Sequence, residues 1–509
     1  MPEPRRRPDG ERPGGRGGGA ERGQGQRRGP RRRSAQTPAQ RARQADPARA
    51  VAYRVLRQVD TEEAFANLVL PAALRSAGLQ GRDAAFATEL TYGTLRLLGL
   101  YDAVVAVAAS RPVEEIDGPV RTVLRLGVHQ LLGMRVPDHA AVSATVALAR
   151  QQVGQGAGGF VNAVLRRVSE QDRDAWVAQL LAPVDDPLAR LALEHSHPEW
   201  VVRALRAGLV SARGAPTAEQ ELAPLLSAHN TPGPLTLVAR PGLGAEQELE
   251  DAGATPAPVA PTAWVLPQGD PGALGSVREG RAAVQDAGSQ LLTLALASAP
   301  LEGPDQQWLD LCAGPGGKAG LLAALAAGAG ARLRANEVSE HRAELVRHTL
   351  VGPVHGGAQV DVTVGDGREI GTAQPQTYDR VLVDAPCTGL GALRRRPEAR
   401  WRRSPQDLTT LGPLQRALLD SALRATRPGG LVAYATCSPH LAETELVVRD
   451  VLKRHPGVEQ VDVRPWLRDR SGNPLTDLGP GPWAQLWPHL HGTDGMFVAL
   501  LRVPGRSLG

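Results

Sequence analysis

QWLDLCAGPGGKAGLLAALAAG, residues 307–328, is the most informative segment of this 509-residue chain. Its pattern predicts a short apolar strand, a glycine-rich turn and a helix rich in alanine and leucine. Such a turn lets backbone amides approach a ligand closely at the start of a helix. The spacing is not that of a dinucleotide-binding G-x-G-x-x-G loop, and Ala319 stands where a P-loop needs Ser or Thr. The loop therefore suits a nucleoside ligand without a phosphate.

The pattern of strand followed by helix repeats from this segment to residue 505. Further strands are expected in RLRAN, AQVDVTV, YDRVLV, LVAYA and MFVALLRV. Repeated strand–helix units predict a mostly parallel, doubly wound α/β sheet. Ligands of such sheets bind beyond the carboxyl ends of the strands.

Three regions precede this α/β domain, which we place at residues 281–505. Residues 1–47 are low in complexity and predict a disordered basic tail. Residues 48–180 carry apolar residues at helical spacing, as in ARAVAYRVLRQV, and predict a small all-α bundle. Residues 181–280 are dense in Pro and Gly around the alternating strand LTLVAR, and predict a small α+β linker domain.

The net charge of +5 is distributed unevenly. Residues 1–47 hold 13 arginines against five acidic residues, so the rest of the chain is slightly acidic. The tail could speed encounters with RNA, and solvated padding is an equally good interpretation. Lys318 and Lys453 are the only lysines, a bias expected of a GC-rich coding sequence. Because this bias inflates arginine clusters, RNA binding by the folded part has to rest on local patches.

The sequence also predicts the cellular compartment of the protein. No apolar run approaches the roughly 18 residues of a membrane span, and no apolar segment follows the N-terminal arginines as a signal peptide requires. Cys312, Cys387 and Cys437 are too few and too far apart for a disulfide framework or a zinc site. We therefore expect a cytoplasmic protein with free thiols, no bound metal and no membrane contact.

Polar residues follow the predicted strands at their carboxyl ends. Glu337 follows RLRAN, and an acidic residue about 20 positions beyond a glycine-rich loop commonly binds ribose hydroxyls. Asp366, in GDGR, could accept a hydrogen bond from an adenine amino group or cap a helix. The motif DAPC, with Asp384 and Cys387, follows RVLV, and Cys437 in TCS follows LVAYA. We expect these side chains to share one site at the edge of the sheet.

Two thiols beside a nucleoside site indicate chemistry that uses both of them. Carbon 5 of cytosine is too weak a nucleophile to take a methyl group directly, but a thiolate added to carbon 6 lets it attack a sulfonium methyl. A second group can then help to remove the carbon 5 proton, so that the covalent bond breaks. Asp384 could stabilise the adduct through a hydrogen bond to the base. From the residues alone, Cys387 and Cys437 could each be the attacking thiol.

These motifs together resemble the Sun family of RNA (cytosine-5) methyltransferases. The resemblance covers roughly residues 190–505 and rests on QDAGSQLLTLAL, LDLCAGPGGK, NEVSEHR, GDGR, DAPCTGLGALRRRPEARW, TCSPHLAETE and HGTDGMFVALLR. It implies a Rossmann-like class I methyltransferase fold and S-adenosylmethionine as the cofactor. The segment 48–180 resembles a NusB-like RNA-binding domain, and this combination implies the bacterial branch that methylates 16S ribosomal RNA.

The resemblance also implies individual roles. It makes Cys437 the nucleophile and Cys387 the cysteine that helps to release the product. This chain has CAGPGGKA where the family commonly has CAAPGGKT, so the loop is more flexible and the residue after its lysine lacks a hydroxyl. The residues implied to contact S-adenosylmethionine are Cys312, Ala313, Gly314, Pro315, Gly316, Gly317, Lys318, Glu337, Asp366 and Asp384.

The segment RRRPEARWRR, residues 394–403, follows DAPC on the same rim. Arginines interleaved with a tryptophan fit phosphate contacts and base stacking. A solvated charged face is the alternative, and the position beside the catalytic strand favours RNA. The residues predicted to bind RNA are Arg394, Arg395, Arg396, Arg400 and Trp401.

We expect an S-adenosylmethionine-dependent rRNA (cytosine-C5) methyltransferase that acts as a monomer. Three other functions are compatible with parts of the sequence. The same chemistry could act on tRNA or another RNA, since only the NusB-like region favours ribosomal RNA. A non-catalytic RNA-binding or ribosome-assembly factor could keep this fold, but the presence of both thiols, Lys318 and Asp384 speaks against it. Methylation of an amino nitrogen is disfavoured because such enzymes typically carry Pro-Pro-aromatic after the Asp, where this chain has Ala-Pro-Cys.

Overall fold

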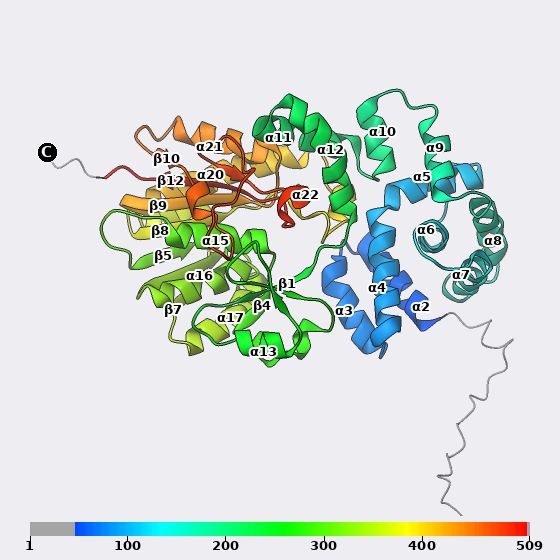
Figure 1. Ribbon diagram of the computed structural model, residues 1–509, viewed down its shortest axis with the longest axis horizontal. Helices are drawn as coiled ribbons and strands as arrows, with labels where there is room; N and C mark the ends of the chain where they lie inside the picture. Colours follow the sequence, from blue (N-terminus) through cyan, green and yellow to red (C-terminus); the bar gives the residue numbers. More distant parts are fainter. Residues whose placement is uncertain (1–45, 506–509) are drawn as a thin grey trace, which may run out of the picture. The chain divides into compact units, whose positions relative to one another are not determined.

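The computed structural model describes residues 46–505, so the tail predicted for residues 1–47 lies almost wholly outside the described residues. The first part of the described chain is entirely helical (Figure 1). On its first helix, Val51, Val55 and Val59 recur every fourth residue and form a buried face. The helices are α2 (Pro47–Thr61), α3 (Ala66–Ser76), α4 (Gly81–Arg96), α5 (Leu98–Ala109), α6 (Gly118–Leu132), α7 (Asp138–Gln152), α8 (Ala157–Val168) and α9 (Arg173–Leu181).

Three more helices and a small antiparallel sheet follow. The helices are α10 (Pro187–Glu194), α11 (Glu199–Arg213) and α12 (Ala215–Asn230). The sheet has the strand order β2-β3-β1-β4 and flanks two short helices, α13 (Glu246–Asp251) and α14 (Gly275–Arg278). Its strands are β1 (Leu235–Ala239), β2 (Thr255–Pro256), β3 (Ala263–Leu266) and β4 (Ala282–Val284).

The C-terminal part is built on an eight-stranded sheet of order β10-β12-β9-β8-β5-β6-β7, with β11 paired to β12. The strands from β7 to β9 are parallel to one another, and β12, β10 and β11 add antiparallel pairs at one edge. The bounds are β5 (Gln307–Asp310), β6 (Arg332–Glu337), β7 (Gln359–Val364), β8 (Tyr378–Asp384), β9 (Thr426–Thr436), β10 (Glu459–Val461), β11 (Ala484–Gln485) and β12 (Phe497–Arg502). The predicted fold classes, all-α followed by a small α+β part and a mostly parallel α/β sheet, are confirmed.

Helices cover both faces of the large sheet (Figure 1). On β8, Val381 and Val383 point to one core while Leu382 points to the other, as the two-residue period of a strand requires. The first core includes α11, α12, α20 and α21, and the second includes α15, α16 and α17. The bounds are α15 (Ala287–Ser298), α16 (Gly317–Gly328), α17 (Glu340–His355), α18 (Gly367–Ala373), α19 (Ala399–Arg402), α20 (Asp407–Ala425), α21 (Glu445–Leu452) and α22 (Pro488–His491).

The strand order places the site. The chain runs outward from β5 through β6 to β7, and then returns to lay β8 on the other side of β5. The loops after β5 and β8 therefore diverge to opposite sides of the sheet and leave a crevice, the usual ligand position in this fold. The glycine-rich loop follows β5 and the DAPC motif follows β8, so topology brings them together.

Within residues 46–505 no single helix has the length and apolar character of a membrane span. Helices α4 and α5 reach that length and hydropathy only as a pair, with a bend of 78° between them.

Candidate active site

The glycine-rich loop is shaped by its fit to Glu337. The Gly314 amide donates to Glu337 Oε2 at 3.1 Å, and a Cβ on Gly314 would overlap that oxygen. Gly316 caps α16 with φ of +110°, a conformation that favours glycine, and a Cβ there would press on Thr349. The loop thus keeps its backbone open toward the crevice at the start of α16.

Glu337 is held in place as a ligand-binding carboxylate would be. It is 2% exposed at the end of β6, and its other oxygen accepts from the Ser339 amide at 3.1 Å. Arg342 lies 3.4 Å from it and also donates to the Gly314 carbonyl. The carboxylate therefore sits against the loop, where the sequence placed it.

Asp366 serves here as a helix cap, one of the two roles that its position suggested. Its Oδ1 accepts from the Arg368 amide at 2.9 Å at the start of α18. The Arg368 side chain also pairs with it, and this hydrogen bond lowers the pKa of Asp366. Contact with an adenine amino group stays a prediction.

Asp310, the last residue of β5, is a further candidate site residue. It lies within the motif LDLCAGPGGK but was not among the residues predicted from sequence. It is 1% exposed, and neither carboxylate oxygen has a well-directed hydrogen-bond partner within the described residues. Burial, and then the charge of Asp384, raise the pKa of Asp310 to about 7. An unpaired buried carboxylate is costly unless a ligand satisfies it.

These features fit S-adenosylmethionine. The cofactor's amino acid part carries an ammonium group that could satisfy Asp310, and its ribose hydroxyls could donate to Glu337. The open backbone between Gly314 and Gly317 leaves room for close approach. No three His, Cys, Asp or Glu side chains between residues 46 and 505 are grouped as a metal site would need.

Cys312, also in the loop, belongs more to the core than to the crevice. Its side chain packs against the hydrophobic core on one face of the large sheet. Burial raises the pKa of its thiol well above the usual value, and the neighbouring carboxylate of Asp310 acts in the same direction. A buried thiol with a raised pKa is a weak nucleophile at neutral pH, so the backbone of Cys312 is the part better suited to a cofactor contact.

Lys318 and Asp384 form an ion pair at the centre of the site. Lys318 Nζ lies 2.7 Å from Asp384 Oδ2, with the side chains 12% and 28% exposed. Burial alone would lower the pKa of Lys318, but the charge and hydrogen bond of Asp384 together raise it. The lysine is therefore a fixed positive charge beside the crevice.

The two cysteines predicted at strand ends are brought into contact. Strands β8 and β9 are parallel neighbours in which Asp384 is the partner of Ala435. Cys387 and Cys437 follow these positions, and their sulfur atoms lie 3.4 Å apart, within hydrogen-bond distance. Both thiols are partly buried.

The surroundings of the two thiols differ. The hydrogen bond from Cys387 lowers the pKa of Cys437, burial and Asp384 oppose this, and the positive charges of Lys318 and Arg396 support it. The same hydrogen bond, burial and nearby negative charges raise the pKa of Cys387. Cys437 is therefore the more acidic thiol of the pair and Cys387 the less acidic one, a difference that sequence spacing alone did not predict.

Much of the positive charge in the segment 394–403 is paired with acceptors inside the protein. Arg394 is 6% exposed and pairs with Asp286 at 3.0 Å and Asp494 at 3.3 Å. Arg395 also pairs with Asp494. The RNA contact predicted for Arg394 does not fit this placement, because its donors already have buried acceptors.

Arg400 is fully buried between the N-terminal helices and the C-terminal part. It donates to the carbonyls of Arg96, at 3.2 Å, and Ser196, at 3.0 Å, and to Asn230 Oδ1 at 2.8 Å. A Cβ on Gly99 would overlap the ring of Trp401. The predicted RNA contact of Arg400 is thus replaced by a structural role, because the guanidinium satisfies backbone carbonyls that would otherwise be buried alone.

Three of the predicted RNA-binding residues keep exposed surface. Arg395 is 36% exposed in its side chain and Trp401 is 37% exposed. Arg396 lies over the ring of Phe65, 5.2 Å from its centroid, and contributes to the pKa of Cys437. RNA contact through these three residues stays a prediction.

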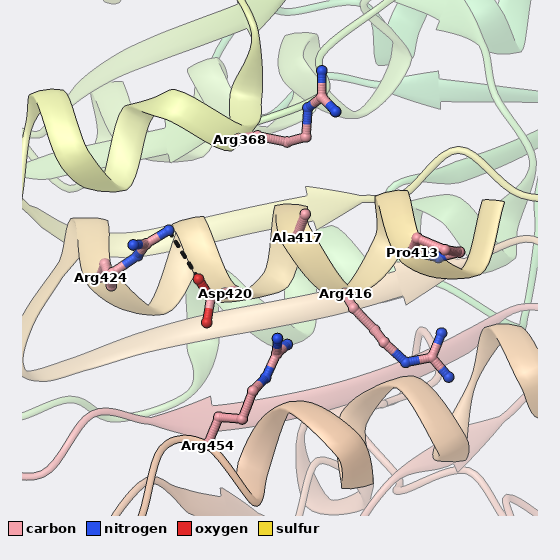
Figure 2. A pocket seen from close by; sticks show the side chains of 7 residues that line it. All are labelled: Arg368, Pro413, Arg416, Ala417, Asp420, Arg424 and Arg454. Atoms are coloured by element: carbon pink, nitrogen blue, oxygen red, sulfur yellow. Dashed lines mark ion pairs between the residues drawn. The ribbon is translucent and has the colours of Figure 1, made fainter. Parts of the chain in front are cut away.

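A pocket of about 500 Å³ lies elsewhere on the C-terminal part, between α18, α20 and the end of α21 (Figure 2). Neither reactive cysteine lines it. Three of its arginines are already paired, with Asp366, Asp420 and Asp450, so much of its positive charge is neutralised. Its lining residues are Arg368, Pro413, Arg416, Ala417, Asp420, Arg424 and Arg454.

Comparison with known proteins finds two family models that match different parts of the chain. A family model described as 16S rRNA methyltransferase RsmB/F matches residues 297–502, and the NusB family model matches residues 46–170. Rv1407 of Mycobacterium tuberculosis, named as a methyltransferase, is 50% identical over 464 residues, 91% of this chain and 98% of its own. Ribosomal RNA small subunit methyltransferase B of Thermus thermophilus is 34% identical over 460 residues, 89% of this chain and 97% of its own.

A solved structure shares the fold over nearly the same length. The crystal structure of PH0851 aligns with a TM-score of 0.72 and 22% sequence identity, covering 90% of this chain and 99% of that one. The likeness therefore extends through the N-terminal helices as well as the large sheet.

Proposed function

Because the chain belongs to the RsmB/F family of methyltransferases, we propose that it transfers a methyl group from S-adenosylmethionine to carbon 5 of a specific cytosine in 16S ribosomal RNA. The observation that carries this proposal is the thiol pair, with sulfur atoms 3.4 Å apart and opposite pKa shifts. Methylation of an amino nitrogen has no use for such a pair, whereas carbon 5 chemistry needs an attacking thiolate and a base.

The cofactor would be held by the backbone of the glycine-rich loop, with Glu337 at the ribose and Asp310 at the amino group. When bound, it supplies an electrophilic sulfonium methyl. The protein's task is then to make carbon 5 of the cytosine nucleophilic at the right position.

Cys437 starts the reaction by adding its thiolate sulfur to carbon 6, which breaks the carbon 5–carbon 6 double bond and leaves its electron pair at carbon 5 to form the bond to the methyl group. Asp384, held by Lys318 at 2.7 Å, can accept a hydrogen bond from the amino group of the base, or from its ring nitrogen once that nitrogen is protonated. Once carbon 5 carries the methyl group, Cys387, having released its own proton to water, removes the carbon 5 proton as a thiolate. The electron pair of that bond restores the ring double bond, and the carbon 6–sulfur bond breaks to return the Cys437 thiolate.

A mechanism-based adduct tests this chemistry. RNA containing 5-fluorocytidine has no removable proton at carbon 5, so the enzyme should stay covalently bound in the presence of S-adenosylmethionine. We expect a slowly migrating protein–RNA species on denaturing gels with the wild type and none with Cys437→Ala. With ordinary RNA, Cys387→Ala should accumulate the same adduct. Absence of adduct on any RNA would falsify the proposed chemistry.

The choice of substrate rests on the relatives and on the N-terminal helices. Proteins named ribosomal RNA small subunit methyltransferase B match this chain over almost their whole length, and the NusB match covers the helices that we propose to bind RNA. We place the reaction in the cytoplasm, where ribosomal RNA is modified, and expect the protein to act as a monomer. Bisulfite sequencing of 16S ribosomal RNA from a deletion strain identifies the cytosine, and an unchanged pattern there with a changed tRNA would redirect the proposal.

A further inference from the structure

Glu443 is a buried carboxylate directly behind the two cysteine loops. It lies in the short 3-10 helix η4 (Leu441–Glu443) and is fully buried. Its Oε1 accepts from the Thr388 amide at 2.8 Å and from Gln415 Nε2 at 3.2 Å, and its Oε2 accepts from the Thr388 hydroxyl. Among the described residues no cationic side chain lies within ion-pair distance of it. Neutral donors therefore satisfy this charge, and most of them belong to one residue.

These hydrogen bonds fix the backbone on both sides of Cys387. Thr388, the following residue, is bound to Glu443 through its amide and its hydroxyl. Pro386, the preceding residue, has its carbonyl held by Gln415 at 2.8 Å, and Gln415 is itself bound to Glu443. The residues before and after Cys387 are thus both held by hydrogen bonds that lead to the Glu443 carboxylate.

The same network reaches the loop of the second cysteine. The Thr388 hydroxyl lies 3.2 Å from Ser438 Oγ, next to Cys437 in the chain. The Cys437 carbonyl accepts from the Gly391 amide at 2.9 Å, which ties its loop to the segment after Cys387. The spacing between the two sulfur atoms is therefore set by contacts that converge on Thr388 and Glu443.

The charge of Glu443 also acts on Cys387. Together with the hydrogen bond to Cys437 and burial, it raises the pKa of Cys387. A group of higher pKa is a stronger base once it is deprotonated. The hydrogen bonds of Glu443 and its charge therefore both act on Cys387, the thiol assigned to the second half of the reaction.

We propose that Glu443, acting through Thr388, is the positioning residue for product release, because it holds Cys387 against the carbon 5 proton of the methylated adduct. The inference rests on the proposed function and adds a residue to its second step. In that step Cys387 takes the proton, the carbon 5–hydrogen electron pair becomes the ring double bond, and the carbon 6–sulfur pair returns to Cys437. Loss of Glu443 should then slow release much more than attack.

Two pairs of variants separate this role from general support of the fold. Glu443→Gln keeps the shape but removes the charge and one acceptor, and Glu445→Gln is its control, since Glu445 accepts from Ser211 Oγ at 2.6 Å on the neighbouring helix. Thr388→Val removes only the bridging hydroxyl, and Thr388→Ser restores it. Each variant is incubated as the full chain with ordinary 16S ribosomal RNA and S-adenosylmethionine.

We expect Glu443→Gln and Thr388→Val to accumulate protein–RNA adduct on denaturing gels. Their first burst of S-adenosylhomocysteine should stay near the wild-type rate, while steady turnover falls by roughly tenfold to a hundredfold, part of what a general base contributes. Thr388→Ser and Glu445→Gln should behave like the wild type.

The proposal is overturned if burst and turnover fall together in the first two variants without adduct, or if Thr388→Ser is as slow as Thr388→Val. If Glu443→Gln does not fold, the two Thr388 variants decide the question. A wild type that forms no adduct with 5-fluorocytidine RNA would instead remove the proposed function, so the two failures are distinguishable.

Discussion

Cys437 and Cys387 are the same residue type just past the ends of neighbouring strands, yet their neighbours push their pKa values apart. The thiol hydrogen of Cys387 and the charge of Lys318 favour the Cys437 thiolate, while Glu443 and Asp384 act against a thiolate at Cys387. A free thiol has a pKa of about 8.5, so an attacking cysteine gains from such a shift at neutral pH. At this scale the activity depends on which group donates to which sulfur.

A pH profile of Cys437 tests this dependence. Cys387 donates to the charged form of Cys437, so Cys387→Ala should raise the pKa of Cys437. Alkylation of Cys437 by iodoacetamide, followed by mass spectrometry, should then rise with pH through a higher midpoint than in the wild type. Cys312→Ala, which removes a thiol not bonded to Cys437, should leave the midpoint where it is. A midpoint that moves down in Cys387→Ala would contradict the assignment of donor and acceptor.

At the scale of elements, the loop between β5 and α16 works because three strand ends meet around it. The Gly314 amide donates to Glu337 at the end of β6, and Lys318 in the first turn of α16 pairs with Asp384 at the end of β8. The strand order β8-β5-β6 makes this convergence unavoidable. Glycine at position 316 is a matter of conformation and space, since its φ of +110° favours glycine and a Cβ there would press on Thr349 of α17.

Gly316→Ala tests the fit of this loop. Gly316 has a φ of +110°, which favours glycine, and a Cβ there would press on Thr349, so the loop has to shift at the start of α16. We expect the dissociation constant for S-adenosylmethionine, measured by isothermal titration calorimetry, to rise by about tenfold or more, equivalent to about 1.4 kcal/mol. Gly328→Ala, at the end of the same helix and in open space, is the matched control. Unchanged affinity in Gly316→Ala would show that the loop does not contact the cofactor.

At the scale of the whole molecule, the segment after DAPC connects the catalytic edge to the N-terminal helices. It leaves the Cys387 loop, pairs with Asp286 and Asp494 through Arg394, and ends in the buried guanidinium of Arg400. Arg402 continues this contact by donating to the carbonyl of Val59 at 2.7 Å. The segment that resembled an RNA-binding patch is therefore largely an internal connection.

Substitution of Arg400 should weaken this connection. Arg400→Met keeps the volume but leaves the carbonyls of Arg96 and Ser196 buried without a donor. We expect a loss of about 2–4 kcal/mol in the free energy of unfolding, measured by urea denaturation, because each unsatisfied buried group costs about 1–3 kcal/mol. Arg403→Met, which breaks only a partly exposed pair with Asp407, should cost about 0.5 kcal/mol or less. Equal stabilities would mean that Arg400 does not join the two parts.

The sequence determined the features that depend on short-range pattern. Strand and helix periods predicted the fold classes, and the position of polar residues after strands predicted that Glu337, Asp366, Asp384 and the two cysteines would share one edge. Such an edge can be predicted from short-range pattern because parallel strands aim their carboxyl ends the same way, whatever the rest of the chain does.

Tertiary structure alone decided the partners of buried charges. Arg394 and Arg400 are read in sequence as exposed cations, yet their acceptors come from residues a hundred or more positions away. The unpaired carboxylate of Asp310 and the anchoring of Thr388 by Glu443 are equally invisible in a string of letters. Periodicity reports which face of an element is buried, but a charge is satisfied by whatever group the fold brings to it.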